Sequence, residues 1–292
     1  MRDPQSIPQR IAIAWNPDVP DADREAREIE SALRAAGLSE VRAASLQDES
    51  LHASVGAGAV DLLVALGGDG TMLRAGRLCG PNHVPVLGIN MGRFGFLMEV
   101  ERGQWRDFLS PLLAGHFRLE DRMMLQAEHW RGDTCLNAWT VMNEVVVCRG
   151  KDVRPIRLRA YVDGYQLATY VADGLIAATP TGSSAYALAA GGPIMPPELR
   201  NILIIPVAPH LSVDRAVILS EGVCVTIQVE SRYDTVVSVD GQNPEQVLEG
   251  DLIKAYAGDH GVSFVRFQDA GYFYRNLTAY MEQNPTSGLP MR

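Results

Sequence analysis

Apolar residues in the first hundred positions form short runs, and amphipathic segments alternate with them. The runs are of strand length and predict buried β-strands at residues 10–15, 41–46, 62–66 and 84–89. Residues 21–36 place their apolar side chains near one face of a helix, and Gly37 follows its end. Strands that alternate with helices predict a parallel sheet whose functional groups lie at the carboxyl ends of the strands.

The pattern changes after about residue 100. One further helix is predicted at 101–113, and from about residue 122 the chain becomes a series of short β-rich segments. These segments are 124–130, 136–147, 156–162, 167–171, 175–178, 202–207, 223–229, 235–239, 252–256 and 263–267. Asp163-Gly164 is a type I′ hairpin signal, a helix is predicted at 184–190, and an amphipathic helix at 272–281. We therefore expect an α/β N-terminal domain with a parallel sheet and a mostly antiparallel all-β C-terminal domain.

A glycine-rich turn follows the third apolar run. Residues 67–71 read Gly-Gly-Asp-Gly-Thr, and helix-forming residues continue from Thr71. A strand, a glycine-rich turn and a helix let backbone N–H groups approach phosphate oxygens. Asp69 would repel a phosphate, so its carboxylate suits removal of a proton from a hydroxyl or binding of a divalent cation. A tight turn with Asp69 as a local cap is the alternative. Asn90 ends the next run, so both side chains are expected at one sheet edge.

Composition narrows the classes of function. The chain of 292 residues is long enough for about two domains and is 47% hydrophobic and 21% charged, as in globular proteins. Its net charge of -9 argues against non-specific binding of nucleic acid or anionic membranes. The 4 cysteines lie far apart and show no zinc spacing, which predicts reduced thiols and a cytoplasmic location. Met1–Gln9 lacks the apolar core of a signal peptide, and no apolar run is long enough to cross a bilayer.

Several motifs, in order along nearly the whole chain, resemble those of the NAD kinase family. The first also resembles, more loosely, diacylglycerol, sphingosine and 6-phosphofructokinases. The motifs are GGDGT with Met-Leu-Arg-Ala behind it, GINMGRFGFL at 88–97, Asn143-Glu144, Asp173-Gly174, TPTGSSAY at 179–186 and GGPI at 191–194. The resemblance implies that the last helix returns to the N-terminal domain. The expected domains are therefore 1–100 plus 270–292, which carries GGDGT, and 101–269, which binds the dinucleotide.

The resemblance also implies an activity. An NAD kinase transfers the γ-phosphoryl group of ATP to the adenosine 2′-hydroxyl of NAD and forms NADP; polyphosphate stays open as an alternative donor. The expected cofactor is a divalent metal, Mg²⁺, which arrives bound to ATP without a dedicated protein site. The expected partners are NAD, ATP and further copies of the chain in a homodimer or homotetramer, with neither nucleic acid nor membrane.

Each motif residue receives an expected role from this resemblance. Asp69 is the general base or orients the hydroxyl, and Gly67, Gly68 and Thr71 form the phosphate loop. The expected substrate-binding residues are Gly70, Arg74, Asn143, Glu144, Arg154, Asp173, Thr181, Ser183, Ser184, Ala185, Tyr186 and Gln242.

The residue types alone leave several choices open. Glu144 lies in the apolar run 139–147, so its carboxylate needs a partner, either an internal arginine or the vicinal diol of a ribose. Thr71 contributes its hydroxyl or caps the helix, and Arg74 turns back toward the glycines or lies in solvent. Tyr186 stacks on a base or fills the core.

The sequence departs from the family pattern at two places. Ser184 stands where the family has threonine and keeps the hydroxyl, whereas residues 212–216 replace a usual Arg-Pro pair and leave the role of that loop open. Arg93 and His210 are weaker candidates near the phosphates. Two other functions remain: a lipid kinase, which would need an apolar acyl cleft, and a dinucleotide-sensing module without activity.

Overall fold

The computed structural model describes residues 7–92, 95–210, 214–275 and 277, which belong to two compact units. Unit 1 consists of Met1–Asp121 and Val262–Arg292, and unit 2 consists of Arg122–Gly261. The sequence placed the domain boundaries near 100 and 269 instead. The boundaries differ because the segments on either side of unit 2 add strands to the sheet of unit 1.

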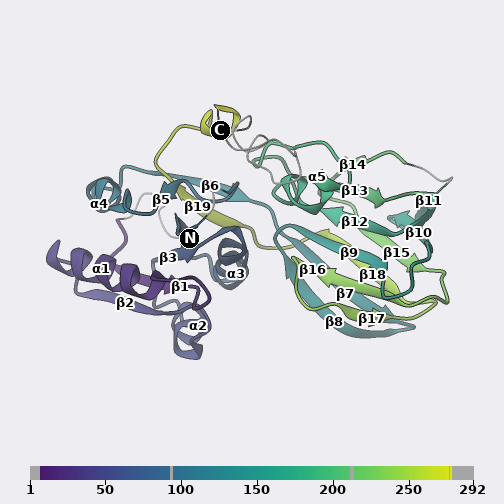
Figure 1. Cartoon of the computed structure of the whole chain (residues 1–292), viewed down its shortest axis with the longest axis horizontal. Coiled ribbons are helices and arrows are strands. Elements are labelled where there is room, and N and C mark those ends of the chain that lie inside the picture. Colours follow the sequence, from purple (N-terminus) through teal and green to yellow (C-terminus); the bar gives the residue numbers. More distant parts are fainter. Residues whose placement is uncertain (1–6, 93–94, 211–213, 276, 278–292) are drawn as a thin grey trace. The chain divides into compact units, whose positions relative to one another are not determined.

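Unit 1 contains a seven-stranded sheet with the order β2-β1-β3-β4-β19-β6, in which β5 also pairs with β4 (Figure 1). The strands are β1 (Arg10–Trp15), β2 (Glu40–Ser45), β3 (Leu62–Gly67), β4 (Val86–Asn90), β5 (Val100–Glu101), β6 (Arg118–Arg122) and β19 (Val262–Arg266). The helices are α1 (Ala22–Ala35), α2 (Glu49–Gly56), α3 (Asp69–Cys79), η1 (Gly80–Asn82) and α4 (Trp105–Leu113). The pairings of β1 with β2 and β3, and of β3 with β4, are parallel, which confirms the predicted sheet.

Burial explains why these segments were predictable. Every residue of β3 and β4 is buried, as expected for central strands with both faces covered. Helix α1 buries Ala26, Ile29 and Leu33 on one face, and Gly37 behind it has a φ of 101°, in the left-handed region. Helix α2 was not predicted; it begins where the Asp48 side chain accepts a hydrogen bond from the Ser50 N–H.

Two elements of unit 1 differ from expectation. Strand β19 pairs in parallel with β4 through Phe264 and Val86, whereas the sequence assigned it to the β-rich domain. That assignment was wrong because β4, with which β19 pairs, is far from β19 in the sequence, and the local pattern does not reveal such a partner. Residues 272–275 are helical and belong to unit 1, and residues 278–281 of the predicted final helix lie outside the described residues.

Unit 2 consists of two antiparallel six-stranded sheets with the orders β11-β10-β15-β18-β7-β8 and β14-β13-β12-β9-β16-β17 (Figure 1). The first contains β7 (Leu125–Arg131), β8 (Thr134–Val141), β10 (Ile156–Val162), β11 (Tyr165–Ala172), β15 (Val225–Val229) and β18 (Leu252–Ala257). The second contains β9 (Glu144–Arg149), β12 (Gly174–Ala178), β13 (Asn201–Val207), β14 (Val217–Ser220), β16 (Thr235–Val239) and β17 (Glu245–Val247). Inward side chains of both sheets, among them Leu125, Val145 and Ile253, form one buried core.

The local signals in unit 2 are confirmed with two changes. Asp163 and Gly164 have φ values of 49° and 83° and join β10 to β11, as a type I′ turn requires. The predicted strand 136–147 is two strands, β8 and β9, separated at Met142-Asn143. The predicted helix 184–190 is a short η2 (Gly182–Ser184) followed by α5 (Tyr186–Ala189), which packs on the outer face of the second sheet through Ala187.

Candidate active site

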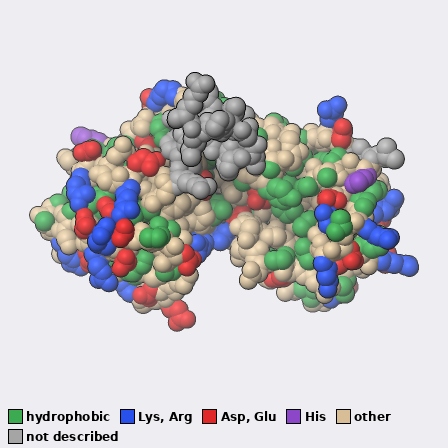
Figure 2. Space-filling model, in the orientation of Figure 1, with side chains coloured by type: hydrophobic (Ala, Val, Ile, Leu, Met, Phe, Trp, Pro, Cys, Tyr) green, Lys and Arg blue, Asp and Glu red, His purple; other side chains and the backbone are tan. Residues whose placement is uncertain are grey.

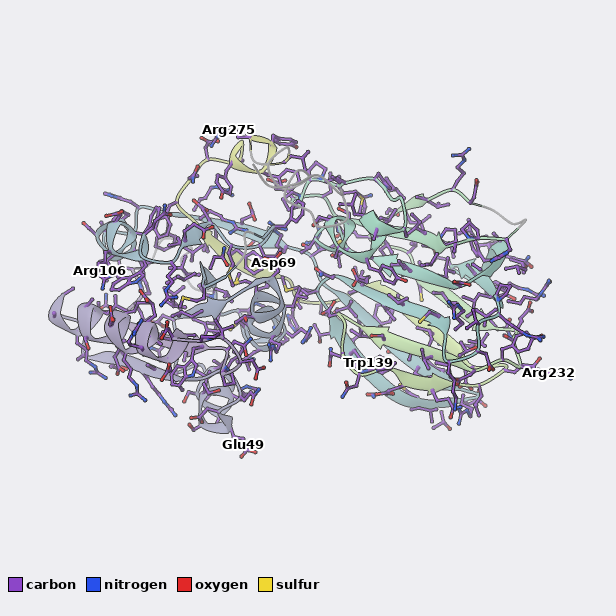
Figure 3. The ribbon with its side chains drawn as sticks, viewed as in Figure 1. Glu49, Asp69, Arg106, Trp139, Arg232 and Arg275 are labelled. Carbon is purple, nitrogen blue, oxygen red and sulfur yellow. The ribbon has the colours of Figure 1, made fainter. Side chains whose placement is uncertain are left out.

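The glycine-rich turn of unit 1 holds the Asp69 side chain in a fixed position. Strand β3 ends at Gly67, Gly68 is the extended N-cap, and Asp69 is the first residue of α3 (Figure 3). The two Asp69 carboxylate oxygens accept backbone N–H groups of Phe96, at 2.9 Å, and of Leu97, at 3.1 Å. The second motif, residues 88–97, therefore orients the carboxylate of the first.

Two glycines allow this close packing. A Cβ on Gly95 would lie 2.3 Å from Asp69 Oδ1, so any side chain there would displace the carboxylate. A Cβ on Gly67 would lie 2.0 Å from Thr71 Oγ1. Thr71 is 1% exposed and its hydroxyl has no hydrogen-bond partner within the described chain, so Thr71 does not cap α3.

Arg74 and Asn90 flank the glycine-rich turn, and Asn90 lies at the sheet edge where the sequence predicted it. Arg74 Nε donates to the Gly70 carbonyl at 3.4 Å, so the side chain turns back toward the start of α3. Asn90 is the register partner of Gly67 at the carboxyl ends of β3 and β4. Its amide nitrogen donates to both carboxylate oxygens of Glu101, at 3.1 and 3.2 Å, a contact that sequence reasoning missed. Arg93 lies outside the described residues.

In unit 2, Met142 and Asn143 lie between β8 and β9, and Glu144 is the first residue of β9. Glu144 is 7% exposed, and neither Glu144 Oε2 nor Asn143 Oδ1 has a hydrogen-bond partner in the described part of the chain. Burial raises the pKa of Glu144 to about 8, the negative charge of Asp240 adds to this, and a backbone hydrogen bond from Tyr186 opposes it. No arginine pairs with Glu144 among the described residues, so the first of the two partners considered for this carboxylate, an internal arginine, is not found there.

The segment 179–186 packs against this turn. Thr179 Oγ1 donates to the Met142 carbonyl at 2.7 Å, and a Cβ on Gly182 would lie 2.2 Å from the Asn143 carbonyl oxygen. Gly182 is therefore required by close backbone approach. The turn that carries Asn143 and Glu144 is thus supported by the TPTGSSAY motif.

The hydroxyls of this segment are engaged within unit 2. Ser183 is fully buried; its Oγ donates to the Pro180 carbonyl at 2.6 Å and accepts the Met195 N–H at 2.9 Å. Thr181 Oγ1 accepts from Arg122, and Ser184 Oγ donates to the Thr181 carbonyl. Direct contact of these hydroxyls with a substrate stays a prediction.

Polar groups also gather near Tyr186, which begins α5 and is 44% exposed. Burial raises the Tyr186 pKa, the negative charge of Asp173 raises it further, and the positive charge of Arg149 opposes this rise. Asp173 pairs with Arg149 at 3.0 Å, and Cys148 is opposite Gly174 in the pairing of β9 with β12. Ala185 separates η2 from α5 and sets the direction in which Tyr186 leaves the turn.

Two further predicted binding residues, Arg154 and Gln242, are exposed on unit 2. Arg154 lies over the Tyr233 ring at 5.5 Å and donates to its hydroxyl at 3.3 Å. Gln242 is exposed in the turn after β16 and lines a surface hollow with Trp139 and Glu245. Contact of either residue with the dinucleotide stays a prediction.

The Asp240 side chain makes contacts that the sequence did not predict. Asp240 has a φ of 47° and Gly241 a φ of 68°, and the Gln242 N–H donates to the Val239 carbonyl, so this Asp-Gly pair forms a type I′ turn. The pair gave no sign that the Asp240 carboxylate accepts backbone N–H groups of Met142, Asn143 and Glu144. Such a contact joins segments almost a hundred residues apart and has no local signature.

The described helices include none that is both long and apolar enough to span a membrane. On the visible face of unit 1, acidic and basic side chains lie interspersed rather than gathered by sign (Figure 2). A surface with mixed charges attracts charged ligands only weakly over long distances, so we expect ligand binding to depend on a local polar site.

The carboxylate in the glycine-rich βα turn of unit 1 and the buried pair of polar acceptors in unit 2 each fit a nucleotide-dependent phosphotransferase. The profile of the ATP-NAD kinase N-terminal domain matches residues 11–117, and that of the ATP-NAD kinase C-terminal domain matches residues 142–267. The chain belongs to the NAD kinase family.

Relatives and solved structures agree over both units. The NAD kinase of Chloroflexus aurantiacus is 34% identical over 94% of this chain and 99% of its own. That of Syntrophotalea carbinolica is 38% identical over 91% of this chain and 95% of its own. Yeast NADH kinase complexed with NADH has a TM-score of 0.83 at 25% identity, covering 99% of this chain and 90% of that one. The Archaeoglobus fulgidus NAD kinase in complex with ATP has a TM-score of 0.73 at 26% identity, covering 93% and 98%.

Proposed function

We propose that this chain is an NAD kinase that transfers the γ-phosphoryl group of ATP to the adenosine 2′-hydroxyl of NAD, with Asp69 as the general base. The observation that carries this proposal is the buried acceptor pair in unit 2. Glu144 Oε2 and Asn143 Oδ1 have no hydrogen-bond partner in the described part of the protein. A buried polar atom without a partner costs about 1–3 kcal/mol, so a ligand that supplies donors binds favourably.

A ribose diol supplies such donors. Its two adjacent hydroxyls donate to one carboxylate, which is how dinucleotide-binding folds hold a ribose. Because burial keeps the pKa of Glu144 at about 8, much of this carboxyl is protonated at neutral pH before the ligand binds. Hydroxyl donors favour the ionised form, so NAD binding and ionisation of Glu144 support each other.

Asp69 supplies a base that is oriented in advance. Two backbone N–H groups, from Phe96 and Leu97, fix its carboxylate, and an ionised carboxylate accepts about four hydrogen bonds. It therefore has the capacity to accept the acceptor hydroxyl's proton as the phosphoryl group is transferred. Proton removal of this kind typically contributes about 10²–10⁴-fold in rate.

The donor and its metal need little from the protein. Within the described residues no group of three or more His, Cys, Asp or Glu side chains is placed to hold a metal ion. Mg²⁺ bound to the ATP phosphates would neutralise part of their negative charge during the transfer. The glycine-rich turn between β3 and α3 is the kind of site at which backbone N–H groups bind phosphate oxygens. A homo-oligomeric state stays a prediction from the resemblance, and a cytoplasmic location stays a prediction from the spacing of the cysteines.

A coupled assay tests the activity. Purified protein is incubated with NAD, Mg²⁺ and ATP, and NADP is measured with an NADP-specific dehydrogenase. Formation of NADP that depends on ATP supports the proposal, and NAD binding by calorimetry without NADP formation supports the sensing module instead. Replacement of ATP by polyphosphate, and of NAD by NADH, defines donor and acceptor choice.

A further inference from the structure

The turn that presents Asn143 and Glu144 is held by a third acidic residue that belongs to another hairpin. Asp240 Oδ1 accepts the backbone N–H groups of Asn143, at 2.7 Å, and Glu144, at 3.2 Å, and Asp240 Oδ2 accepts that of Met142, at 2.9 Å. The Asp240 N–H donates to the Glu144 carbonyl at 3.0 Å. One side chain therefore fixes three successive peptide N–H groups.

The carbonyl side of the same turn is also bonded. Thr179 Oγ1 donates to the Met142 carbonyl at 2.7 Å, and the Thr179 N–H donates to the Asn143 carbonyl at 2.8 Å. The backbone of residues 142–144 is thus satisfied on both sides, and the Asn143 and Glu144 side chains carry the buried acceptor atoms without partners in the described chain. Backbone groups that are fully paired determine where those side chains point.

We propose that Asp240 is a positioning residue of the NAD site, which fixes the direction of Asn143 and Glu144 and whose negative charge sets the pH at which Glu144 binds NAD. The proposal rests on the proposed function of that site. Asp240 itself need not touch NAD, because it acts through the peptide groups of residues 142–144.

The charge of Asp240 acts on Glu144 in a definite direction. A neighbouring negative charge disfavours ionisation, and Asp240 adds in this way to the effect of burial on the Glu144 pKa. The other groups that border Glu144 are the Tyr186 backbone, which opposes the shift, and, around the Tyr186 ring, Cys148 and the Arg149–Asp173 pair. Removal of the Asp240 charge should therefore lower the pKa of Glu144 and move NAD binding to lower pH.

The test substitutes Asp240→Asn. Asparagine adopts the left-handed conformation of this turn readily, so the hairpin is kept. Its amide offers one acceptor oxygen instead of two and places an NH₂ donor against backbone N–H groups, so at least one of the three bonds is lost. Asp163→Asn is the matched control, because Asp163 occupies the same position of a type I′ turn and its carboxylate accepts the N–H of Cys224, far from residues 142–144 in the sequence.

We expect Asp240→Asn to raise the calorimetric Kd for NAD about tenfold at pH 9, where Glu144 is mainly ionised in both proteins. The midpoint of the rise in NAD affinity with pH should move below that of the wild type. Turnover at saturating NAD should fall by less than the Kd rises. Amide hydrogen exchange of residues 142–144 should accelerate, and Asp163→Asn should match the wild type in all four measurements.

An NAD Kd within twofold of the wild type at pH 9, together with an unmoved midpoint, contradicts the positioning role. Equal effects of Asp240→Asn and Asp163→Asn contradict it as well, since they would reflect a general loss of stability. A wild-type protein that binds NAD but forms no NADP contradicts only the proposed function, because the binding comparison still tests Asp240.

Discussion

Asp69 of unit 1 and Glu144 of unit 2 are carboxylates beside turns, but the surrounding backbone treats them differently. Asp69 accepts two N–H groups, from Phe96 and Leu97, without the help of a ligand. Glu144 is 7% exposed, and its Oε2 has no partner in the described chain. The first carboxylate is oriented by the fold alone, whereas the second lacks donors that a ligand brings.

The difference assigns different kinetic roles to the two residues. A group whose position is fixed by the protein suits a step in which geometry decides the rate. A buried carboxylate with one oxygen that lacks a hydrogen-bond partner suits recognition, because a ligand that donates to this oxygen removes the free-energy cost of leaving it unpaired. Changes at Asp69 should therefore appear in turnover, and changes at Glu144 should appear in NAD affinity.

The largest expected effect follows Asp69→Asn. The substitution is nearly isosteric but removes the base, so turnover should fall about 10²–10⁴-fold. The calorimetric Kd for NAD should stay within about threefold, since the recognition groups of unit 2 are unchanged. Turnover close to that of the wild type would show that Asp69 is not the base, and a large rise in Kd would remove the distinction between the two carboxylates.

Gly95→Ala should have the next largest effect and requires no change in Asp69 itself. A Cβ at residue 95 would lie 2.3 Å from Asp69 Oδ1, so the carboxylate must move away from its two N–H donors. Displacement of a catalytic group by about 1 Å can reduce the rate about 10²-fold. Gly92→Ala is the matched control, because a Cβ there meets nothing within 4 Å. Equal turnover of the two variants in the coupled assay would contradict the fixed position of Asp69.

Glu144→Gln should raise the Kd for NAD about tenfold, because a charge-assisted hydrogen bond to the diol is lost. Wild-type affinity should rise as the pH passes through about 8, the pKa of Glu144, and the variant should lack this rise. Calorimetric titrations between pH 6 and pH 9 measure both effects. An unchanged Kd would contradict the role of Glu144 in binding the ribose.

Glu144→Gln should weaken NAD binding but should increase the stability of the ligand-free protein at high pH. The Glu144 carboxyl has an ordinary pKa of 4.5 and a folded pKa of about 8, so the folded state binds more protons between these values. The free energy of unfolding therefore falls as the pH rises through this range. Glutamine does not ionise, so the variant lacks this decrease. Glu144→Gln should be relatively more stable than the wild type at pH 9 than at pH 5 in urea unfolding.

Glu128→Gln provides the contrast within unit 2. Hydrogen bonds from Tyr256 and Trp130 lower the pKa of Glu128, so its charged form stabilises the folded state at neutral pH. This substitution should reduce stability and leave the NAD Kd unchanged. If Glu144→Gln and Glu128→Gln were both less stable than the wild type at pH 9, the result would contradict the view that Glu144 serves binding at a cost in stability.

Local patterns in the sequence predicted much of the fold. Buried runs marked β1, β3 and β4, the Asp163-Gly164 pair marked a hairpin, and the glycine-rich turn was placed correctly at a strand end. These features depend on neighbouring residues, through alternation, turn conformation and burial. For the same reason the pattern of strands and helices was enough to expect Asp69 and Asn90 at one sheet edge.

Contacts between distant segments could not be predicted in this way. The break between β8 and β9 depends on Asp240, the membership of β19 depends on β4, and the orientation of Asp69 depends on Phe96 and Leu97. Each is a long-range hydrogen bond or pairing without a local periodicity. Local patterns therefore identified the residue types of the site, and only the folded chain shows which backbone groups hold them.

The smallest expected effect belongs to Arg154→Ala and concerns the edge of unit 2. Arg154 is exposed and lies over Tyr233, so its contribution to binding an anionic dinucleotide is screened by solvent. We expect a rise of about threefold in the NAD Kd at low ionic strength, which disappears at 1 M salt because the Debye length there is about 3 Å. Arg232→Ala removes another exposed charge, which pairs with Glu249, and should leave the Kd unchanged at both salt concentrations. A salt-independent effect of Arg154→Ala would instead assign it to lost packing on Tyr233, and recognition in unit 2 would then rest on the buried acceptor pair without help from this charge.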